Sequence, residues 1–429
     1  MIKFLKRLWR DRRGNALIIA AGALPLVIGS AGLASDTIQW TLWKRQLQRA
    51  ADSAALAGVY AKVQTADTGM TPQDAVDTDL AKNNQTGIAL LSGYPQVTFP
   101  ADTSTYKHAV KVTLAIQKKL GFTSLFLSTP PTIIAEGTAA TVEKGVYCVV
   151  SLESTSATGI TATGNGNVNL GCGMITNSTS LTAAIATGSS TVNATPIAAV
   201  GDIQSSSNWG SAELLPFTVQ EDDPFADVNP PSFTPCQGGG PTNRLTVGTG
   251  DNVDRSAIDA AGTVVCFSEM GIQGDVILGS ATYVLDGGDF TVGAQAHVTC
   301  AGCTIILTNS SSGSTATIGD VDINAGAEID MSAPTTGTYD GILFYQDRRA
   351  QSGPSKVNRI NGNSDSLMTG AFYFPNQQLD INGTAGLTFS CAQFVARNVN
   401  FSGNGSITNT CTAGYGSNSI LADHVRLIA

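Results

Sequence analysis

Three groups of acidic residues are the positions at which this chain could carry out acid–base chemistry or bind a metal ion. Two carboxylates supply the acid and the base of glycan hydrolysis, and carboxylate oxygens are also good calcium ligands. The first group is Asp286 with Asp289, the second is Asp320, Asp322, Glu328 and Asp330, and the third is Asp340 with Asp347 and Arg348. Asp320 and Asp322 stand two positions apart, so they would share one face of a strand.

These carboxylates have a simpler interpretation, in which turn aspartates hydrate the surface of a repetitive fold. The three histidines, His108, His297 and His424, lack the neighbours of a catalytic setting, and the chain has no serine nucleophile elbow. We therefore predict no catalytic, cofactor-binding or metal-binding residues, no cofactor, and a chain that is not an enzyme. Calcium binding by the carboxylates of residues 320–330 stays a hypothesis.

The eight cysteines are expected to be structural. An even number is typical of disulfides formed in an oxidising compartment. Cys300 and Cys303 have redox-motif spacing, but they lie between strand-like pieces and not at a helix start, where a thiolate would be stabilised. Zinc would need a second close pair. Proximity in the sequence suggests the pairs Cys148–Cys172, Cys236–Cys266, Cys300–Cys303 and Cys391–Cys411, although other pairings stay open.

The charge of the chain is low and unevenly placed. The net charge is −9, and six of the 24 basic residues lie within the first 13 positions, which argues against nucleic-acid binding. Charged residues make up 13% of the chain, glycines number 46 and apolar residues make up 42%, so a turn-rich β fold is favoured over disorder. The length of 429 residues suggests two or three domains.

An uncharged apolar segment near the N-terminus predicts a membrane anchor. Residues 14–35 carry no charged side chain, and 22 helical residues extend ~33 Å, enough for the hydrocarbon core of a bilayer. Basic residues dominate positions 1–13, so the N-terminus is expected in the cytoplasm. The run is too long for a cleaved signal and lacks the polar face of a core helix. We expect a single crossing, with the rest of the chain outside the cytoplasm.

Residues 36–145 are expected to form a small α+β module that begins with a continuation of the anchor helix. The apolar side of this helix is rich in alanine, which permits close packing on another helix or a sheet. A plain helical stalk is the alternative. The residues on the apolar side of this helix are Leu42, Leu47, Ala50, Ala51, Ala54, Ala55 and Ala57.

The rest of the module is expected to contain a second helix and a few strands. Thr71 and Pro72 can begin a helix that runs to about Asn83. Alternating apolar residues predict strands within 96–116 and 132–142. Leu120 to Leu127 predict a short helix that buries its aromatic side chains.

Residues 146–429 predict a β-rich body. Short apolar triplets alternate with Gly, Asn, Ser, Thr and Asp, and no run of helical length and periodicity occurs between about 150 and 415. Such strands between tight turns favour a right-handed parallel β-helix, whereas a β-sandwich, the alternative, usually has strands of ~5–6 residues. Prolines and glycines between 204 and 244 predict a loop or linker, either an excursion from one coil or a hinge.

Several of these segments resemble TadE/TadG-like proteins of Tad (Flp) pilus assembly. The similar stretches are Arg-Arg-Gly-Asn-Ala-Leu at the start of the anchor, its Ala-Leu-Pro centre, Gly-Leu-Ala-Ser-Asp after it, and Gln-Arg-Ala-Ala-Asp-Ser-Ala-Ala-Leu-Ala-Gly from Gln48 to Gly58. In the body, Gly164-Asn-Gly-Asn-Val and Gly370-Ala-Phe-Tyr-Phe-Pro are similar to TadG-related C-terminal regions. The resemblance implies an inner-membrane accessory protein with a pilin-like module.

Taken together, the sequence predicts a non-enzymatic, single-pass inner-membrane component of Tad pilus assembly with its bulk in the periplasm. Its expected partners are other Tad proteins and pseudopilins, together with membrane lipid. The alternative is a membrane-anchored β-helix protein that binds or cleaves envelope glycans. Some TadG-like proteins carry a metal-binding von Willebrand type A domain, but Ser151 stands where its first aspartate is needed, so we do not expect that domain.

We predict that the N-terminus is not cut after Gly14. Prepilin-like proteins are cleaved after a glycine that is followed by a glutamate at the fifth mature position, and the fifth residue here is Ile19. N-terminal sequencing of the protein extracted from membranes should therefore not begin at Asn15. A sequence starting at Asn15 would contradict the prediction.

Overall fold

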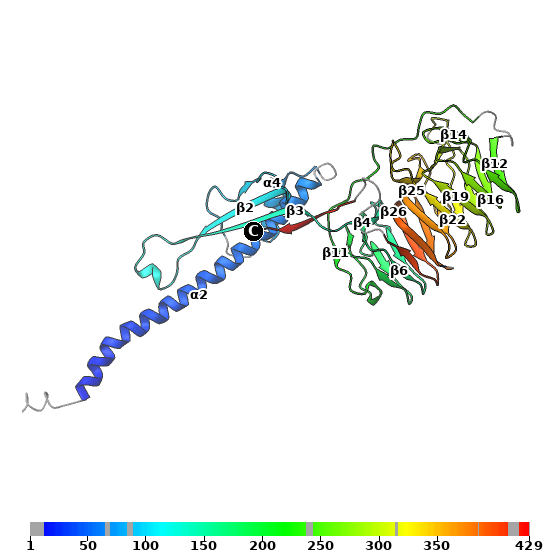
Figure 1. Ribbon diagram of the computed structural model, residues 1–429. Helices are drawn as coiled ribbons and strands as arrows, with labels where there is room; N and C mark the ends of the chain where they lie inside the picture. Colours follow the sequence, from blue (N-terminus) through cyan, green and yellow to red (C-terminus); the bar gives the residue numbers. More distant parts are fainter. Residues whose placement is uncertain are drawn as a thin grey trace, which may run out of the picture. The chain divides into compact units, whose positions relative to one another are not determined.

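The computed structural model describes residues 13–64, 69–83, 89–236, 243–313, 316–384, 386–410 and 420–428 (Figure 1). The basic segment before position 13 lies outside these ranges. The chain forms two compact units, the first from residues 1–142 with 425–429 and the second from residues 143–424.

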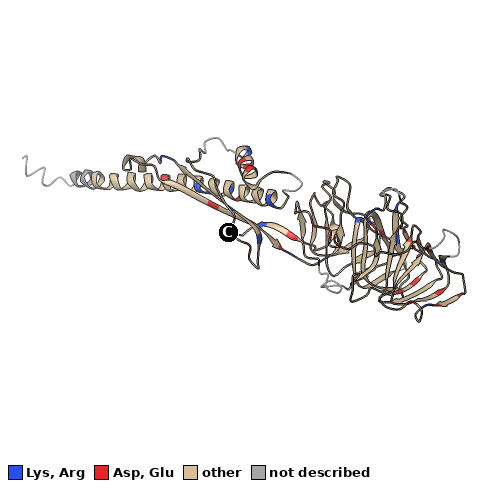
Figure 2. Ribbon diagram, turned by 90° about the horizontal axis from the view of Figure 1, so that it is seen from above, with Lys and Arg blue, Asp and Glu red and all other residues tan. Residues whose placement is uncertain are grey.

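The first unit is built on one long helix, α2 (Arg13–Val63), whose N-terminal half is apolar. It is the one helix among the described residues that is long and apolar enough to cross a membrane. Side chains such as Val27 and Leu26 are 63% and 75% exposed, so this half is not covered by the rest of its unit. In Figure 2 the part of the α2 ribbon that is not grey carries the colours of charged residues only further along the helix. Pro25 lies inside this apolar half of the helix.

The second half of α2 packs on a four-stranded sheet through small side chains. The sheet has the order β1 (Gln96–Thr98), β2 (Lys107–Gln117), β3 (Thr132–Glu143) and β28 (Asp423–Leu427). Ala51, Ala54 and Ala55 are fully buried, so part of the alanine side predicted from the sequence faces the unit's own sheet, whereas Leu42 is half exposed. A Cβ atom on Gly137 of β3 would lie 2.7 Å from the backbone of Ala51, which shows how closely helix and strand approach.

The second helix, α4 (Pro72–Lys82), begins and ends where the sequence predicts. The Thr71 hydroxyl caps it by accepting a hydrogen bond from the backbone N–H of Asp74 at 3.2 Å, and Asn83 is its C-cap. Ala75 and Val76 bury its apolar side. The prediction for this element is confirmed.

The segment after β2 differs from its prediction. It contains a single 3-10 turn, η1 (Thr123–Leu125), and not a longer helix. The predicted burial of its aromatic side chains is wrong: Phe126 is 74% exposed, as is Leu125. Phe122 is half-buried against α2. The segment contacts the helix at only one end, so its remaining apolar side chains have no neighbours to cover them.

The second unit is a stack of parallel strands. Its first part has β4 (Tyr147–Ser151), β5 (Ile160–Ala162), β6 (Asn167–Asn169), β7 (Gly173–Thr176), β8 (Ala184–Ala186), β9 (Thr191–Asn193), β10 (Ile197–Ala199), η2 (Ser207–Trp209) and β11 (Leu214–Pro216). Its second part has β12 (Arg244–Val247), β13 (Asn252–Asp254), β14 (Val264–Phe267), β15 (Glu269–Ile272), β16 (Asp275–Leu278), β17 (Thr282–Asp286), β18 (Phe290–Val292), β19 (His297–Ala301), β20 (Thr304–Thr308), β21 (Val321–Ile323), β22 (Glu328–Ser332), β23 (Ile342–Gln346), β24 (Val357–Asn361), β25 (Leu367–Asn382), β26 (Leu387–Ser402) and β27 (Ile407–Asn409).

Three ladders of parallel pairing run the length of this stack. Ladder A joins β12, β15, β18, β21, β24, the ends of β25 and β26, β5 and β8. Ladder B joins β13, β16, β19, β22, the starts of β25 and β26, β27, β6 and β9. Ladder C joins β14, β17, β20, β23, the middles of β25 and β26, β4, β7, β10 and β11. This large parallel sheet is consistent with a parallel β-helix and not with an antiparallel sandwich.

The order of coils along the stack differs from their order along the chain. Strand β26 pairs with β4, so the first coil of the body lies beside its last complete coil. Figure 1 shows the teal β4 and β6 next to the orange β25 and β26. From β11, at one end of the stack, the chain must travel to β12 at the other end. Residues 217–236, which we call the return segment, are the described part of that path.

The return segment covers the outer side of ladder C. The strands of this ladder are apolar on both of their faces. Phe344 and Phe372 point into the stack, whereas their neighbours Tyr345 and Tyr373 point outward, and all four are fully buried. Phe225 of the return segment packs edge-on against Tyr373, with ring centroids 5.3 Å apart. Residues 217–236 are therefore a packed excursion along the body and not a free hinge; residues 237–242 lie outside the described part.

Three of the four predicted disulfides are confirmed. Cys148–Cys172, Cys236–Cys266 and Cys300–Cys303 are bonded, with Cα atoms 5.8, 5.5 and 6.1 Å apart. Cys391 is also disulfide-bonded, while Cys411, its predicted partner, lies outside the described residues. The Cys236–Cys266 bond fixes the return segment to β14.

Replacing Gly137 by alanine should destabilise the first unit. The added methyl group would overlap the α2 backbone, which cannot move aside as a flexible side chain would, so a loss of about 1–3 kcal/mol is expected. Hydrogen exchange of the solubilised full chain should show faster exchange in peptides of β3. Gly271→Ala is the matched control on a strand, because its methyl group would meet the Thr291 hydroxyl at an ordinary 3.6 Å. Unchanged exchange in β3 would refute the close approach.

Candidate functional site

The first two candidate carboxylates hold turns of the stack together. Asp286 accepts hydrogen bonds from the backbone N–H groups of Ser310 at 2.7 Å and Cys236 at 3.3 Å. Asp289 accepts one from the backbone N–H of Asp320 at 2.8 Å. Both carboxylates therefore satisfy backbone donors between neighbouring coils.

The second group of carboxylates does not form one site, because its members face different neighbours. Lys356 lies 3.4 Å from Asp320, and His297 lies 3.6 Å from Glu328. Burial raises the pKa of Asp320, although Lys356 opposes the shift. Asp322 is on ladder A and Asp330 on ladder B, and both are exposed.

A different group of potential metal ligands is brought together by the fold. Among the described residues, Cys236, Cys266 and Asp286 form the one group of three whose ligand atoms lie within 4.8 Å of one another. The two sulfur atoms are bonded to each other, so they are not available as thiolate ligands.

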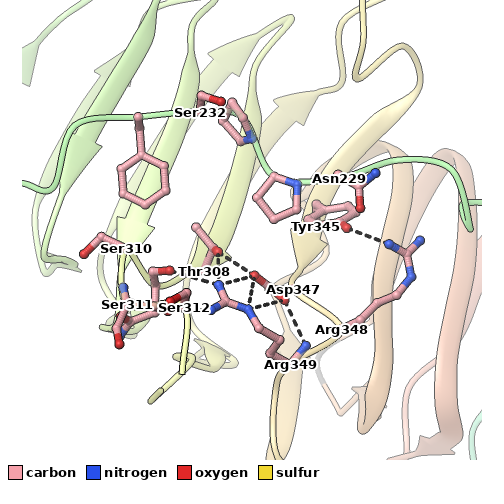
Figure 3. Close-up of a pocket in the computed structure, with 14 residues that line it drawn as sticks. Asn229, Ser232, Thr308, Ser310, Ser311, Ser312, Tyr345, Asp347, Arg348 and Arg349 are labelled. Carbon is pink, nitrogen blue, oxygen red and sulfur yellow. Dashed lines mark hydrogen bonds and ion pairs between the residues drawn. The ribbon is translucent and has the colours of Figure 1, made fainter. Parts of the chain in front are cut away.

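Asp347 and Arg348 of the third group line a groove of the body under the return segment, which we call the main groove (Figure 3). The cavity measures about 670 Å³. Its walls come from the return segment, from the end of β20 with the loop after it, and from the end of β23. They consist of Asn229, Pro230, Pro231, Ser232, Phe233, Thr308, Asn309, Ser310, Ser311, Ser312, Tyr345, Asp347, Arg348 and Arg349. Asp340, the other predicted member of the third group, does not line it.

Asp347 and Arg349 neutralise each other at the floor of this groove. The guanidinium of Arg349 lies 2.7 Å from Asp347 Oδ2, and the Thr308 hydroxyl donates to the same oxygen at 2.6 Å. Burial would raise the pKa of Asp347, but the hydrogen bonds from Arg349 and Thr308 outweigh it and hold the pKa below its ordinary value. Asp347 is the one carboxylate among the described lining residues, whereas glycoside hydrolysis generally uses a pair.

Arg348 holds the return segment against the body. Its guanidinium donates to the carbonyl oxygens of Val228, at 2.8 Å, and Phe225, and it lies over the ring of Tyr373 with its carbon 5.3 Å from the centroid. Its Nε lies 3.5 Å from a carboxylate oxygen of Asp223. The residue that the sequence offered as a catalytic candidate is therefore a structural clamp.

Three tyrosines of the body complete this clamp. Tyr345 donates to Val228 O at 2.8 Å, Tyr339 donates to Asn229 O at 2.7 Å, and Tyr373 donates to Asp223 Oδ2 at 2.6 Å. Sequence analysis missed this role. A signal was present in the pairs Phe344-Tyr345 and Phe372-Tyr373, because adjacent aromatic residues on a strand require that both of its faces be covered.

A second site lies where α2 leaves its apolar half. Asp36 is the first charged residue after the uncharged run and is only 6% exposed. Its carboxylate accepts hydrogen bonds from the backbone N–H groups of Phe122 at 3.1 Å and Thr123 at 2.5 Å, and from the Thr123 hydroxyl at 2.6 Å. The Thr123 hydroxyl, with the backbone donors, outweighs burial and holds the pKa of Asp36 below its ordinary value.

Glu221 should make the stability of the body depend on pH. It lies half-buried at the start of the return segment, where burial, followed by the charges of Asp222 and Asp423, raises its pKa from 4.5 to about 8. Between these two pH values the folded state keeps a proton that the unfolded state has lost. The body should therefore become less stable as pH rises through this window, and the loss should level off above about pH 8.

We expect Glu221→Gln to remove this part of the pH dependence. At pH 9 the variant should be more stable than the wild type by on the order of a few kcal/mol at most, and near pH 4 the difference should vanish. Urea midpoints across this range measure it. Glu213→Gln, which removes a surface carboxylate paired with Lys144, is the matched control. If the urea midpoints of Glu221→Gln and the wild type were equal at every pH, the assignment of this pH dependence to Glu221 would be wrong.

Comparison with known proteins identifies one part of the chain. No curated protein and no solved structure matches it. Residues 14–63, which correspond to α2 with its apolar half and its sheet-packing half, match the family model of the TadE/G-like Flp pilus-assembly domain. The resemblance predicted for this part of the sequence is thereby confirmed. Residues 14–63 are a TadE/G-like domain of the Flp (Tad) pilus-assembly family.

Proposed function

We propose that this protein is a non-enzymatic component of Tad-type pilus assembly, held in the inner membrane by one helix. The observation that carries the proposal is the TadE/G-like match over a helix whose first half is apolar and exposed and whose second half is built into an α+β unit. In this proposal the N-terminus is cytoplasmic, the α+β unit has a pilin-like plan, and the body is a right-handed parallel β-helix in the periplasm.

The proposed mode of action is assembly by surface contact. The buried side of the second half of α2, around Ala51, Ala54 and Ala55, is occupied by the unit's own sheet, so a partner must use another face. Leu42, Arg45, Gln46 and Arg49 are exposed at helical spacing and form one stripe on this half. We define these four residues as the docking stripe and assign it to another Tad subunit.

The proposal that the chain is not an enzyme rests on the role of its charged groups. In the main groove, Asp347 is paired with Arg349, and Arg348 is used by the return segment. Asp286 and Asp289 satisfy backbone donors. These groups are engaged in holding coils together, which leaves them poorly placed to exchange protons with a substrate.

Reversing two charges on the docking stripe should weaken association with Tad components. Arg45→Glu combined with Arg49→Glu keeps two exposed side chains of similar size and changes only their charge, so folding should survive. Co-purification of pilus components with the full-length protein from its own host should drop by about tenfold, as expected for a loss of about 1.4 kcal/mol.

The matched control reverses the charge of Lys82 and Arg359, which are exposed on α4 and β24. This variant has the same net charge as the stripe variant and should co-purify like the wild type. Equal losses in both variants would mean that net charge and not the stripe matters. Undiminished co-purification by the stripe variant would refute the assigned surface.

A second candidate function is binding of envelope glycan in the main groove. The observation in its favour is the cavity of about 670 Å³ with the hydroxyls of Ser310, Ser311 and Ser312 along one wall. The two proposals predict different behaviour for a variant of this groove. Binding of peptidoglycan fragments that is lost in Ser310→Leu, together with unimpaired pilus assembly in that variant, would favour the glycan role.

A further inference from the structure

The segment between β2 and β3 presents apolar side chains at an unusual place. Leu125, Phe126 and Leu127 are consecutive and are 74%, 74% and 52% exposed. On a surface that faces water, such an apolar cluster would be unfavourable. What covers it depends on where the segment lies relative to the anchor helix.

The segment is fixed beside the apolar half of α2. Asp36 accepts three hydrogen bonds from Phe122 and Thr123, which ties the start of η1 to the helix. The Phe122 ring lies 4.0 Å from the position of a Cβ atom on Gly29, and a side chain on Gly32 would overlap it. These glycines precede Asp36 by one to two helical turns, up to ~10 Å along the axis, and belong to the uncharged run. The exposed cluster therefore lies next to the proposed membrane span.

The backbone of the segment is suited to a medium without water. The N–H groups of Phe122 and Thr123 donate to Asp36, and those of residues 124–127 donate to the carbonyl oxygens of Leu120, Phe122 and, for the last two, Thr123, at 2.9–3.1 Å. Every N–H group from 122 to 127 is thus paired within the unit. A backbone that enters lipid must satisfy its polar groups internally, whereas a loop exposed to water has no such need.

The residues on the other side of Asp36 suit the lipid headgroups. Lys118 Nζ lies 5.3 Å from the ring centroid of Trp43, two turns further along α2. Lys119 is exposed and Trp40 is 39% exposed. Tryptophan and lysine are favoured at the headgroup level of a bilayer. Along the helix axis, the apolar side chains come first, then Asp36 with its hydrogen-bond donors, and then the lysine and tryptophan side chains. A bilayer leaflet has the same order, from its hydrocarbon core to its headgroups.

From this arrangement we propose that residues 120–131 form a membrane-inserting loop, in which Leu125, Phe126 and Leu127 enter the outer leaflet beside the anchor helix. The inference rests on the proposed membrane anchor. Lipid is chosen over a second copy of the chain because the cluster is continuous with the lipid-exposed side chains of α2 and because the order of side chains matches a leaflet. The loop would give the anchor a second point of attachment and set the tilt of the α+β unit over the membrane.

Spin labels in proteoliposomes test the loop. A label is placed on the full chain at Leu125→Cys, and matched labels are placed at Leu181→Cys, an equally exposed leucine of the body, and at Val27→Cys in the span. No cysteine among the described residues is free, so labelling should be confined to the new site; unsubstituted protein gives the background. We expect the Leu125 label to lose its broadening by a water-soluble nickel complex while keeping its broadening by oxygen, as at Val27, with Leu181 showing the reverse.

The outcomes separate the loop from the anchor. If Val27 lies in lipid but Leu125 responds to nickel as Leu181 does, the loop is in water and the inference fails while the anchor stands. If Leu125 is shielded from both oxygen and nickel, protein covers it, and the lipid assignment is overturned in favour of a second copy or another subunit. If Val27 itself is open to nickel, the anchor fails and the loop proposal fails with it.

Discussion

The fold of the body depends on ladder C, whose described strands are apolar on both sides. Phe344 and Phe372 fill the interior of the stack, and the neighbouring Tyr345 and Tyr373 bring a second apolar layer to its outer surface. Parallel strands buried on both faces need a covering element, and here it is the return segment, which the chain requires in any case to travel from β11 to β12. The tyrosine hydroxyls and Arg348 then bind the polar backbone of that segment, so one interface meets both the apolar and the hydrogen-bonding requirements.

Much of the fold follows from local patterns in the sequence. The apolar run, the Thr71 cap, the short strands and three disulfides were predictable because each is set by residues close together in the chain. The pairing of β26 with β4 was not, since parallel pairing leaves no turn signature and the two strands are distant in sequence. The same limit applies to the carboxylates, because donors distant in the chain, Ser310 and Cys236 for Asp286 and Thr308 for Asp347, reach them only in the fold. Phe126 was expected inside because aromatic residues usually are, and local periodicity cannot show that no neighbour covers it.

The two halves of α2 illustrate how one helix serves two surroundings. Large side chains such as Leu26 and Val27 are exposed in the first half, whereas alanines are buried in the second, where Gly137 allows the strand to reach the helix backbone. Asp36 marks the change. Its carboxylate is engaged by three donors of a segment 86 residues further along the chain, so the boundary between the halves is also a tertiary contact. The TadE/G-like match covers residues 14–63, so it includes the apolar half, the junction at Asp36 and the sheet-packing half.

The path of the chain between the two units has a consequence for the sheet of the first unit. The chain leaves the first unit after β3, builds the entire body, and returns so that β28 lies next to β3, with the N–H of Ile428 donating to Thr138 O at 2.9 Å. Before β28 pairs with it, β3 is an edge strand with open hydrogen-bonding groups. Without β28, that edge would leave the backbone N–H and C=O groups of β3 open to pairing with another strand. The sheet of the first unit therefore takes its fourth strand from a segment that follows the whole stack in the chain.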